Sequence, residues 1–294
     1  HHNSLRWRSG VNLVVIAAAL VAITVITNAY SFNLMLRNFR QSLSSTAQIY
    51  TEQINGKVDK INSGSLELVS LAASSQNYYT SSPLGRYLTQ QDILTRLQDR
   101  IRYVESSDLY FFYRTDSDEL LTALSNRPST GSSYFWNQYL MLPPTQPANT
   151  WFSVTCNGET WLMCYYNVSQ VRVGAAVRAK TLLQSLYADT GLVQDSGFAL
   201  AGLDGTIVYS SQPDLMACGT SLAGHIPASL IVESHTVPEV GTLLLFRPSS
   251  DLLHQLSGSF GWLLLLNLLA LALITTMLLN TNRHITVPIQ PVSY

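Results

Sequence analysis

Two long apolar stretches lie near the ends of the chain, and the residues between them follow the alternating patterns of a folded domain. The first stretch runs from Ser9 to Leu36 and the second from Gln255 to Asn282, and neither contains a charged residue. At 1.5 Å per helical residue, each is long enough to cross about 30 Å of hydrocarbon. The pattern therefore predicts two transmembrane helices, at residues 11–32 and 257–281.

A helical pattern follows the first span. Residues 33–79 contain no proline, and apolar residues recur at an imperfect helical spacing from Ile49 to Leu71. This spacing predicts a long stalk helix that continues the first span. The stretch Leu88–Val104 predicts a second, amphipathic helix.

The period then changes to two, which is typical of strands with one buried face. The predicted strands of this module, residues 80–188, are Asp108–Tyr113, Glu119–Leu124, Trp151–Thr155, Thr160–Val168 and Val171–Val177. A helix at Thr181–Tyr187 leads away from them. Arg114 to Asp118 form a predicted turn, and Asn157-Gly158 is a typical two-residue hairpin turn.

A smaller strand pattern occupies residues 189–256. Its predicted elements are the strand Phe198–Gly202, an Asp204-Gly205 turn, the strand Thr206–Ser210, a short helix Pro227–Glu233, the strand Thr242–Phe246 and a helix Pro248–Leu256 that leads into the second span. The whole chain is thus expected to be α+β, with a long N-terminal helix and two antiparallel-sheet modules between two transmembrane helices.

Arginines on the outer flanks of the spans set the expected topology. Arg6 and Arg8 precede the first span, and Arg283 follows the second, so both termini are expected in the cytoplasm. Arg37 and Arg40 favour the opposite orientation more weakly. The middle domain is then extracytoplasmic, in a two-span protein of the cell membrane.

Two features of the N-terminus bear on this topology. A cleaved signal peptide is the alternative for the first stretch, but its apolar region exceeds the usual 7–15 residues, which favours an uncleaved anchor. The N-terminal segment 1–10 begins with His1-His2, which looks like the remnant of a purification tag, so we expect a fragment of a longer protein.

Charge and cysteines exclude some classes of function. The formal net charge of −1 does not indicate a nucleic-acid surface. The predicted hairpin pairs Cys156 with Glu159, which leaves Cys164 roughly 15 Å from Cys156 along the strand. A disulfide requires Cα atoms within about 7 Å, so we expect free thiols. No catalytic motif, metal site or cofactor site is evident.

The candidate ligand contacts are mostly aromatic. Trp161 and Tyr165 share one strand face, since the side-chain period of a strand is two. Arg114 and Asp116 lie at a hairpin tip near the same sheet. The full set of candidates is Tyr134, Trp136, Tyr139, Trp161, Tyr165, Arg114 and Asp116. Amphipathic rings with a few polar groups suit a small polar ligand such as a sugar or an amino acid; the alternative is that the aromatic residues form the core of a small sheet.

Two segments carry a resemblance to known families. Val173–Ala176 followed by the helix at Thr181, and GFALAGLDGTIVYSS at Gly197–Ser211, resemble the double Cache sensor of bacterial receptors. This resemblance implies a membrane-distal and a membrane-proximal PAS-like module. Residues 282–294 resemble the start of a HAMP linker, whose Pro288-Ile289 pair would relay the signal into the cytoplasm.

The resemblance also bears on the ligand. Cache sensors for amino acids often carry an Arg-x-Trp-Tyr run, and the corresponding segment Ser133–Asn137 lacks the arginine. This difference makes an amino acid a less favoured ligand. It leaves open the alternative that an extracellular binding protein binds at the pocket.

The two resemblances together imply the sensory region of a histidine kinase that works as a homodimer in the lipid membrane, with its ligand in the distal module. The same sensor on a chemoreceptor, cyclase or membrane-bound transcription regulator is an alternative. A polysaccharide chain-length regulator is another, although such proteins are mostly helical and Asp108–Val177 is rich in strands.

Overall fold

The computed structural model describes residues 2–75, 82–104, 107–125, 148–156, 158–188, 196–223, 226–250, 261–262, 265–266, 268–270 and 272–277. The chain divides into two compact units. One comprises His1–Gln41 with Pro248–Tyr294, and the other comprises Ser42–Arg247.

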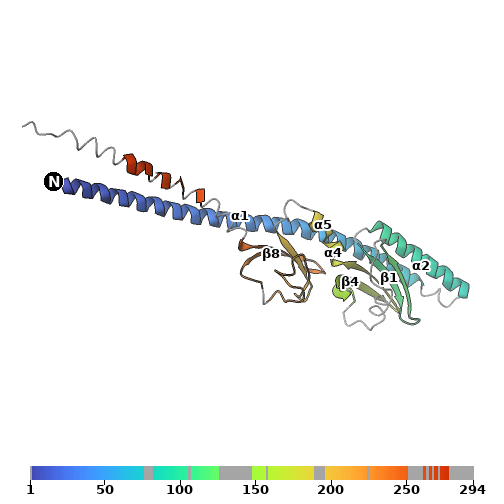
Figure 1. Cartoon of the computed structure of the whole chain (residues 1–294). Coiled ribbons are helices and arrows are strands. Elements are labelled where there is room, and N and C mark those ends of the chain that lie inside the picture. The colour runs from blue at the N-terminus through green and yellow to red at the C-terminus, as the bar shows by residue number, and fades with distance from the viewer. Residues whose placement is uncertain are drawn as a thin grey trace, which may run out of the picture. The chain divides into compact units, whose positions relative to one another are not determined.

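Helix α1 spans His2–Ser75 without a break, so the predicted span and stalk are one helix (Figure 1). Its first part exposes large apolar side chains, including Val21, Ile23 and Ile26, as a helix surrounded by lipid would. Among the described residues, one helix, Val14–Ala73, is long and apolar enough to cross a membrane, with a mean hydropathy of 2.0 in its most apolar window. A shorter apolar helix covers Leu268–Met277, and the second span stays a prediction.

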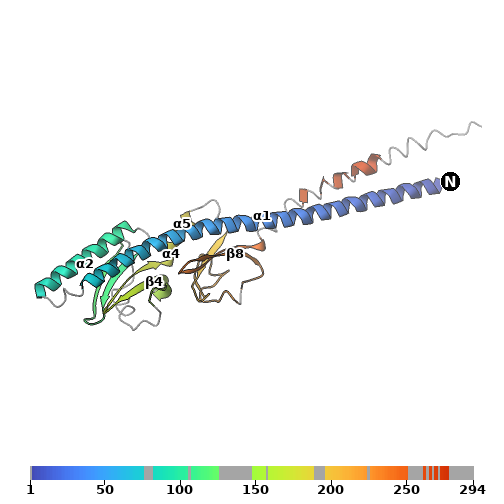
Figure 2. The same cartoon turned by 180° about the vertical axis from the view of Figure 1, so that it is seen from behind.

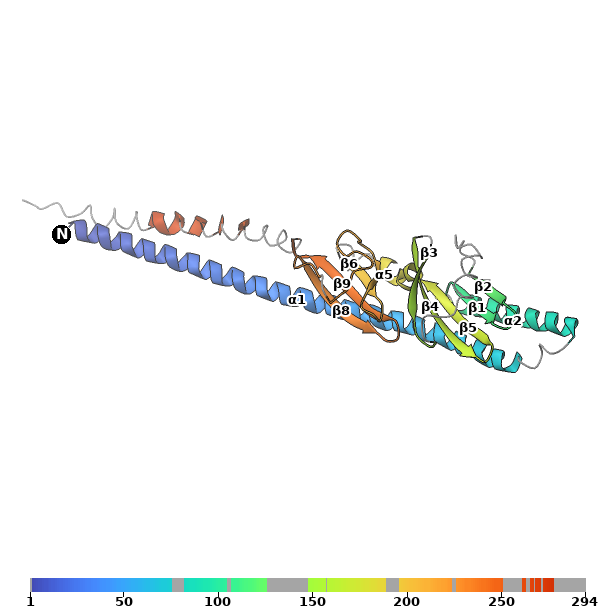
Figure 3. The same cartoon turned by 90° about the horizontal axis from the view of Figure 1, so that it is seen from below.

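The second part of α1 packs against both sheets. Its buried positions recur every three or four residues, which places them on one helix face; they are Leu43, Ala47, Tyr50, Ile54, Val58, Ile61, Leu68 and Ala72. The Tyr110 hydroxyl of one sheet donates to the Ile61 carbonyl over 3.4 Å, and Ser44 Oγ lies 3.2 Å from His235 Nε2 of the other. Figure 3 shows the strands of the two sheets beside successive lengths of α1.

Helix α2, Pro83–Tyr103, begins at Pro83 rather than at the predicted Leu88. The Ser82 hydroxyl accepts a hydrogen bond from the Gly85 N–H over 3.3 Å, and proline suits the first helical turn because it has no N–H to satisfy. Ile93 and Leu97 are buried. Figure 2 shows α2 beside the end of α1, where Arg100 pairs with Glu67.

The distal module contains the larger sheet. Its strands are β1 (Leu109–Arg114), β2 (Glu119–Leu124), β3 (Phe152–Cys156), β4 (Glu159–Val168) and β5 (Val171–Arg178). They form a five-stranded antiparallel sheet in the order β2-β1-β5-β4-β3, with Cys156 opposite Glu159 as predicted. Two short helices, α4 (Ala179–Leu182) and α5 (Gln184–Ala188), take the place of the single helix predicted at Thr181–Tyr187.

The proximal module contains a four-stranded sheet in the order β7-β6-β9-β8. Its strands are β6 (Gly197–Ala201), β7 (Ile207–Ser210), β8 (Leu230–Val237) and β9 (Gly241–Pro248). The predicted helix Pro227–Glu233 is wrong, because the β-branched residues from Ile231 to Val237 favour a strand that pairs with β9. The α+β class, the long helix and the two sheets are confirmed.

Candidate ligand-binding face of the five-stranded sheet

The five-stranded sheet has one face toward α1 and one face away from it. Side chains alternate along a strand, and Tyr110 reaches the Ile61 carbonyl of α1. Its neighbours Leu109, Phe111 and Tyr113 therefore lie on the other side, here called the outer face. The strand register places Arg172, Gly174 and Ala176 of β5 opposite them, and Met163, Tyr165 and Asn167 of β4 opposite those three. Trp161 and Arg178, which pair with each other, continue the same face two residues further along β4 and β5.

The centre of the outer face is an apolar cluster. Trp161 is 1% exposed and Tyr165 is 2% exposed, and both pack with Phe111 and Met163. The ring of Phe152 meets the Tyr165 ring edge-to-face, with centroids 6.0 Å apart. The structure thus brings the two predicted aromatic residues together in a hydrophobic core, and their contact with a ligand stays a prediction.

Gly174 lies in the middle of this face. A Cβ atom there would overlap the Cys164 carbonyl oxygen and come within 2.8 Å of Phe111 Cζ. Glycine is required because the backbone of β4 and the Phe111 ring occupy the space that a side chain would fill.

Arg172 is a functional candidate that the sequence analysis missed. Its guanidinium carbon lies 5.4 Å from the Tyr165 ring centroid and 5.6 Å from that of Tyr113, distances typical of cation–π contacts. The Tyr113 hydroxyl donates to Asp118 Oδ1 over 2.8 Å. Burial, followed by Asp118, raises the pKa of Tyr113, and burial raises the pKa of Tyr165. The hydroxyl groups of Tyr113 and Tyr165 are therefore protonated and uncharged near neutral pH.

Arg178 anchors the other end of the face. Its Nη2 atom donates to Asp108 Oδ1 and its backbone N–H to Asp108 Oδ2, both over 2.8 Å. The guanidinium lies over the Trp161 ring, 5.6 Å from the centroid. The hydrogen bond to Asp108 raises the pKa of Arg178. This arrangement fixes the Trp161 ring and joins the start of β1 to the end of β5.

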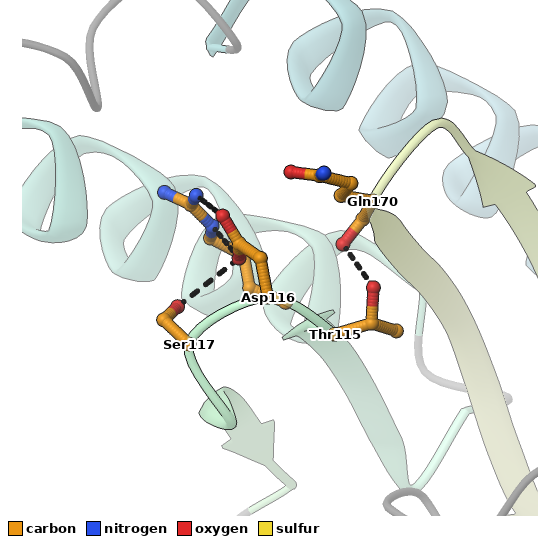
Figure 4. Close-up of polar contacts among 5 residues, drawn as sticks. Thr115, Asp116, Ser117 and Gln170 are labelled. Carbon is orange, nitrogen blue, oxygen red and sulfur yellow. Dashed lines mark hydrogen bonds and ion pairs between the residues drawn. The ribbon is translucent and has the colours of Figure 1, made fainter.

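Of the predicted pair Arg114 and Asp116, Arg114 is the last residue of β1 and Asp116 lies in the β1–β2 turn that follows (Figure 4). Arg114 Nε donates to Asp116 Oδ1 over 2.7 Å, and this bond lowers the pKa of Asp116. Ser117 Oγ donates to the same oxygen over 3.2 Å, and Thr115 Oγ1 donates to the Gln170 carbonyl over 3.0 Å. The two side chains thus bind each other and order the turn, and Arg114, one residue after Tyr113, is on the opposite side of β1 from the outer face.

The other predicted residues lie outside the described part of the chain: Tyr134, Trp136, Tyr139, Pro288 and Ile289. Within the described ranges, no group of three His, Cys, Asp or Glu side chains is arranged to hold a metal ion.

Neither a protein-family profile nor a curated protein matches the chain. Several solved structures do match the chain. The periplasmic sensory domain of the Campylobacter jejuni chemoreceptor Tlp1 matches with a TM-score of 0.50 and 10% identity, over 72% of this chain and 95% of that domain.

Two further sensory domains match at lower TM-scores. The sensory domain of C. jejuni Tlp3, solved with isoleucine bound, gives 0.45 at 10% identity over 76% of this chain and 97% of its own. The ligand-binding domain of Pseudomonas aeruginosa PctC, solved with GABA, gives 0.42 at 14% identity over 70% and 99%. The likeness to Tlp1 shows that the chain has the fold of a periplasmic sensory domain, as the Cache resemblance implied.

Proposed function

We propose that this chain is the extracytoplasmic ligand-sensing and transmembrane region of a bacterial receptor, and that the outer face of the distal sheet binds a small polar ligand. The observation that carries the proposal is the position of Arg172. Its guanidinium lies against two tyrosine rings beside the apolar cluster of the larger sheet. A fixed cation next to aromatic faces is the kind of polar anchor that small-molecule sites use to orient a ligand.

Arg172 also bears on the class of ligand. A guanidinium binds a carboxylate through two parallel hydrogen bonds, and tyrosine faces attract an ammonium group or an apolar body. Arg172 therefore offers the carboxylate partner that the segment Ser133–Asn137 lacks. This chemistry favours an amino acid over a sugar.

Ligand-dependent thermal stabilisation of the whole chain in lipid nanodiscs tests the site. We would screen the twenty amino acids and a set of monosaccharides. Arg172→Gln should abolish the shift in melting temperature that the best ligand causes. Arg114→Gln is the matched control, since it removes an arginine of the same sheet that binds Asp116 instead. A shift of equal size in both variants would exclude the outer face.

The topology we propose places both termini in the cytoplasm and the two sheet modules outside it. The arginines that flank the spans support this orientation, and α1 offers an unbroken connection from the first span to the sheets. The native thiol of Cys218, which is exposed, is a convenient reporter. In a Cys156→Ser background, a membrane-impermeant maleimide should label it in intact cells, whereas Ser293→Cys with both Cys156→Ser and Cys218→Ser should stay unlabelled.

For the output we propose a histidine kinase working as a homodimer, because Asn282–Ile289 resembles the start of a HAMP linker. The two antiparallel sheets argue against a chain-length regulator. Chemotaxis signalling is the second candidate, since Tlp1, whose fold the chain shares, is a chemoreceptor. Fusion of this chain to the kinase core of a HAMP-containing receptor should give ligand-dependent autophosphorylation, and a constant activity would contradict the proposed linkage.

A further inference from the structure

A second candidate site lies between the two sheets of the unit Ser42–Arg247. It is an open cavity of about 860 Å³, within the roughly 300–1,000 Å³ of small-molecule sites. One wall comes from the start of β4 and the end of β5, another from α4 and α5, and a third from β7 and the residues after it. Arg178 is its one residue in common with the outer face, so the cavity is a different surface.

The walls of the cavity are held together by contacts between the modules. Thr160 Oγ1 of β4 donates to the Val208 carbonyl of β7 over 2.9 Å. The hydroxyls of Tyr187 on α5 and Tyr209 on β7 are hydrogen-bonded to each other. The Phe198 ring lies against both, with centroid distances of 4.9 Å to Tyr187 and 6.5 Å to Tyr209. A ligand in the cavity would therefore meet preformed walls from both modules.

The lining carries hydrogen-bonding groups of mixed character. Hydroxyl groups come from Thr160, Thr181, Tyr187, Tyr209 and Ser210. Thr160, whose hydrogen is donated to the Val208 carbonyl, offers acceptor lone pairs, and the Tyr187–Tyr209 pair has one hydroxyl hydrogen not used between them. Gln184 adds an amide, Lys180 adds a donor and Glu159 an acceptor. Arg178 is paired with Asp108, so its charge is balanced, and the other two charged residues of the lining, Lys180 and Glu159, have opposite signs. The cavity therefore has no excess charge to attract an anion.

We propose that this cavity binds a small neutral polyhydroxylated compound, the size of a monosaccharide or disaccharide. The hydroxyls of such a ligand need both donors and acceptors, and the lining supplies both. Its apolar C–H face needs an aromatic surface, and Tyr187, which is 45% exposed, supplies one. The inference goes beyond the proposed function, because the ligand of the outer face is anchored by a cation and this one is not.

Isothermal titration calorimetry on the whole chain in nanodiscs tests the inference. The probes are glucose, galactose, sucrose and maltose, with succinate and glutamate as anionic comparisons. We expect at least one sugar to bind, and Gln184→Ala and Glu159→Gln to weaken it at least tenfold. Gln184 is exposed and Glu159→Gln preserves shape, so both variants should fold, which circular dichroism would verify.

Arg172→Gln on the outer face is the matched control and should leave sugar affinity unchanged. Binding of the anions alone would overturn the inference, and so would binding of none of the six probes. Sugar binding lost only in Arg172→Gln would also overturn it, while supporting a ligand on the outer face. The experiment therefore distinguishes failure of the cavity proposal from failure of the outer-face proposal.

Discussion

The indole N–H of Trp151, next to β3, donates to Asn62 Oδ1 on α1 over 3.2 Å. The other end of the same amide, Asn62 Nδ2, donates to Glu239 Oε2 of the β8–β9 turn over 2.7 Å. One side chain of α1 thus contacts both sheet modules. A displacement of either module relative to α1 changes one of these two bonds.

Substitutions at Asn62 should therefore affect both modules. Asn62→Ala should destabilise the fold by about 1–2 kcal/mol, since a net hydrogen bond contributes about 1 kcal/mol. Asn62→Asp keeps an acceptor for Trp151 but places a carboxylate beside Glu239. We expect this variant to be more stable in a Glu239→Gln background than with Glu239 present, as measured by urea unfolding. Additive effects of the two substitutions would contradict the contact.

The sequence predicts the framework of the fold better than the site. The period of two along Asp108–Val177 was sufficient to predict the strands of the distal module, because each strand buries side chains on defined faces of the sheet. The edge strand β8 was missed, since its partner β9 stabilises it and a short segment alone does not reveal that pairing. Arg172 was missed for the same kind of reason: its neighbours Tyr113 and Tyr165 come from other strands, and only the register places them around it.

The ion pair between Asp108 and Arg178 should be important for stability. The side chain of Asp108 is only 3% exposed. Removal of one partner leaves a buried charge without compensation, so Asp108→Ala should cost about 3–5 kcal/mol. Asp92→Ala is the control, because its i,i+4 pair with Arg96 is on the surface and should contribute at most about 0.5 kcal/mol. Equal losses from the two variants in chemical denaturation would contradict this assignment.

Two glycine-to-alanine substitutions should have opposite effects. Gly174→Ala places a Cβ against the Cys164 carbonyl and Phe111, so it should strongly destabilise the distal module. Gly56→Ala adds a Cβ in open space on α1, and should stabilise the protein by about 0.5–1 kcal/mol through helix propensity. Melting temperatures of the two variants give the comparison. A Gly174→Ala protein as stable as the wild type would show that the outer face is more loosely packed than described.

Asp204 gives the proximal module an acid-sensitive turn. The backbone N–H of Thr206 donates to Asp204 Oδ1 over 3.0 Å and its hydroxyl to Oδ2 over 2.9 Å, and these bonds lower the pKa of Asp204 below its ordinary value of 3.8. Because the pKa of Asp204 is lowered in the folded state, its carboxylate contributes its full stabilisation above about pH 5. That stabilisation is lost as the pH falls through the folded-state pKa. Asp204→Asn should remove this part of the acid dependence. Unfolding free energies of the two proteins should therefore converge as the pH falls from about 5 through the folded-state pKa, and a constant difference over that range would contradict the assignment.

The thiols of Cys164 and Cys218 should differ greatly in reactivity. Cys164 is buried in β4, and burial, with a smaller effect of Glu239, raises the pKa of its thiol to about 12. Cys218 is exposed. The thiolate is the reactive form, so at pH 8 Cys164 should be inert in the folded protein. In a Cys156→Ser background, Ellman's reagent should react quickly with one thiol and reach the second only after unfolding in urea. Cys218→Ser in the same background should abolish the fast phase. A fast phase that persists there would mean that β4 opens on the timescale of the labelling, and that the face of the sheet toward α1 is less firmly packed than the buried Cys164 indicates.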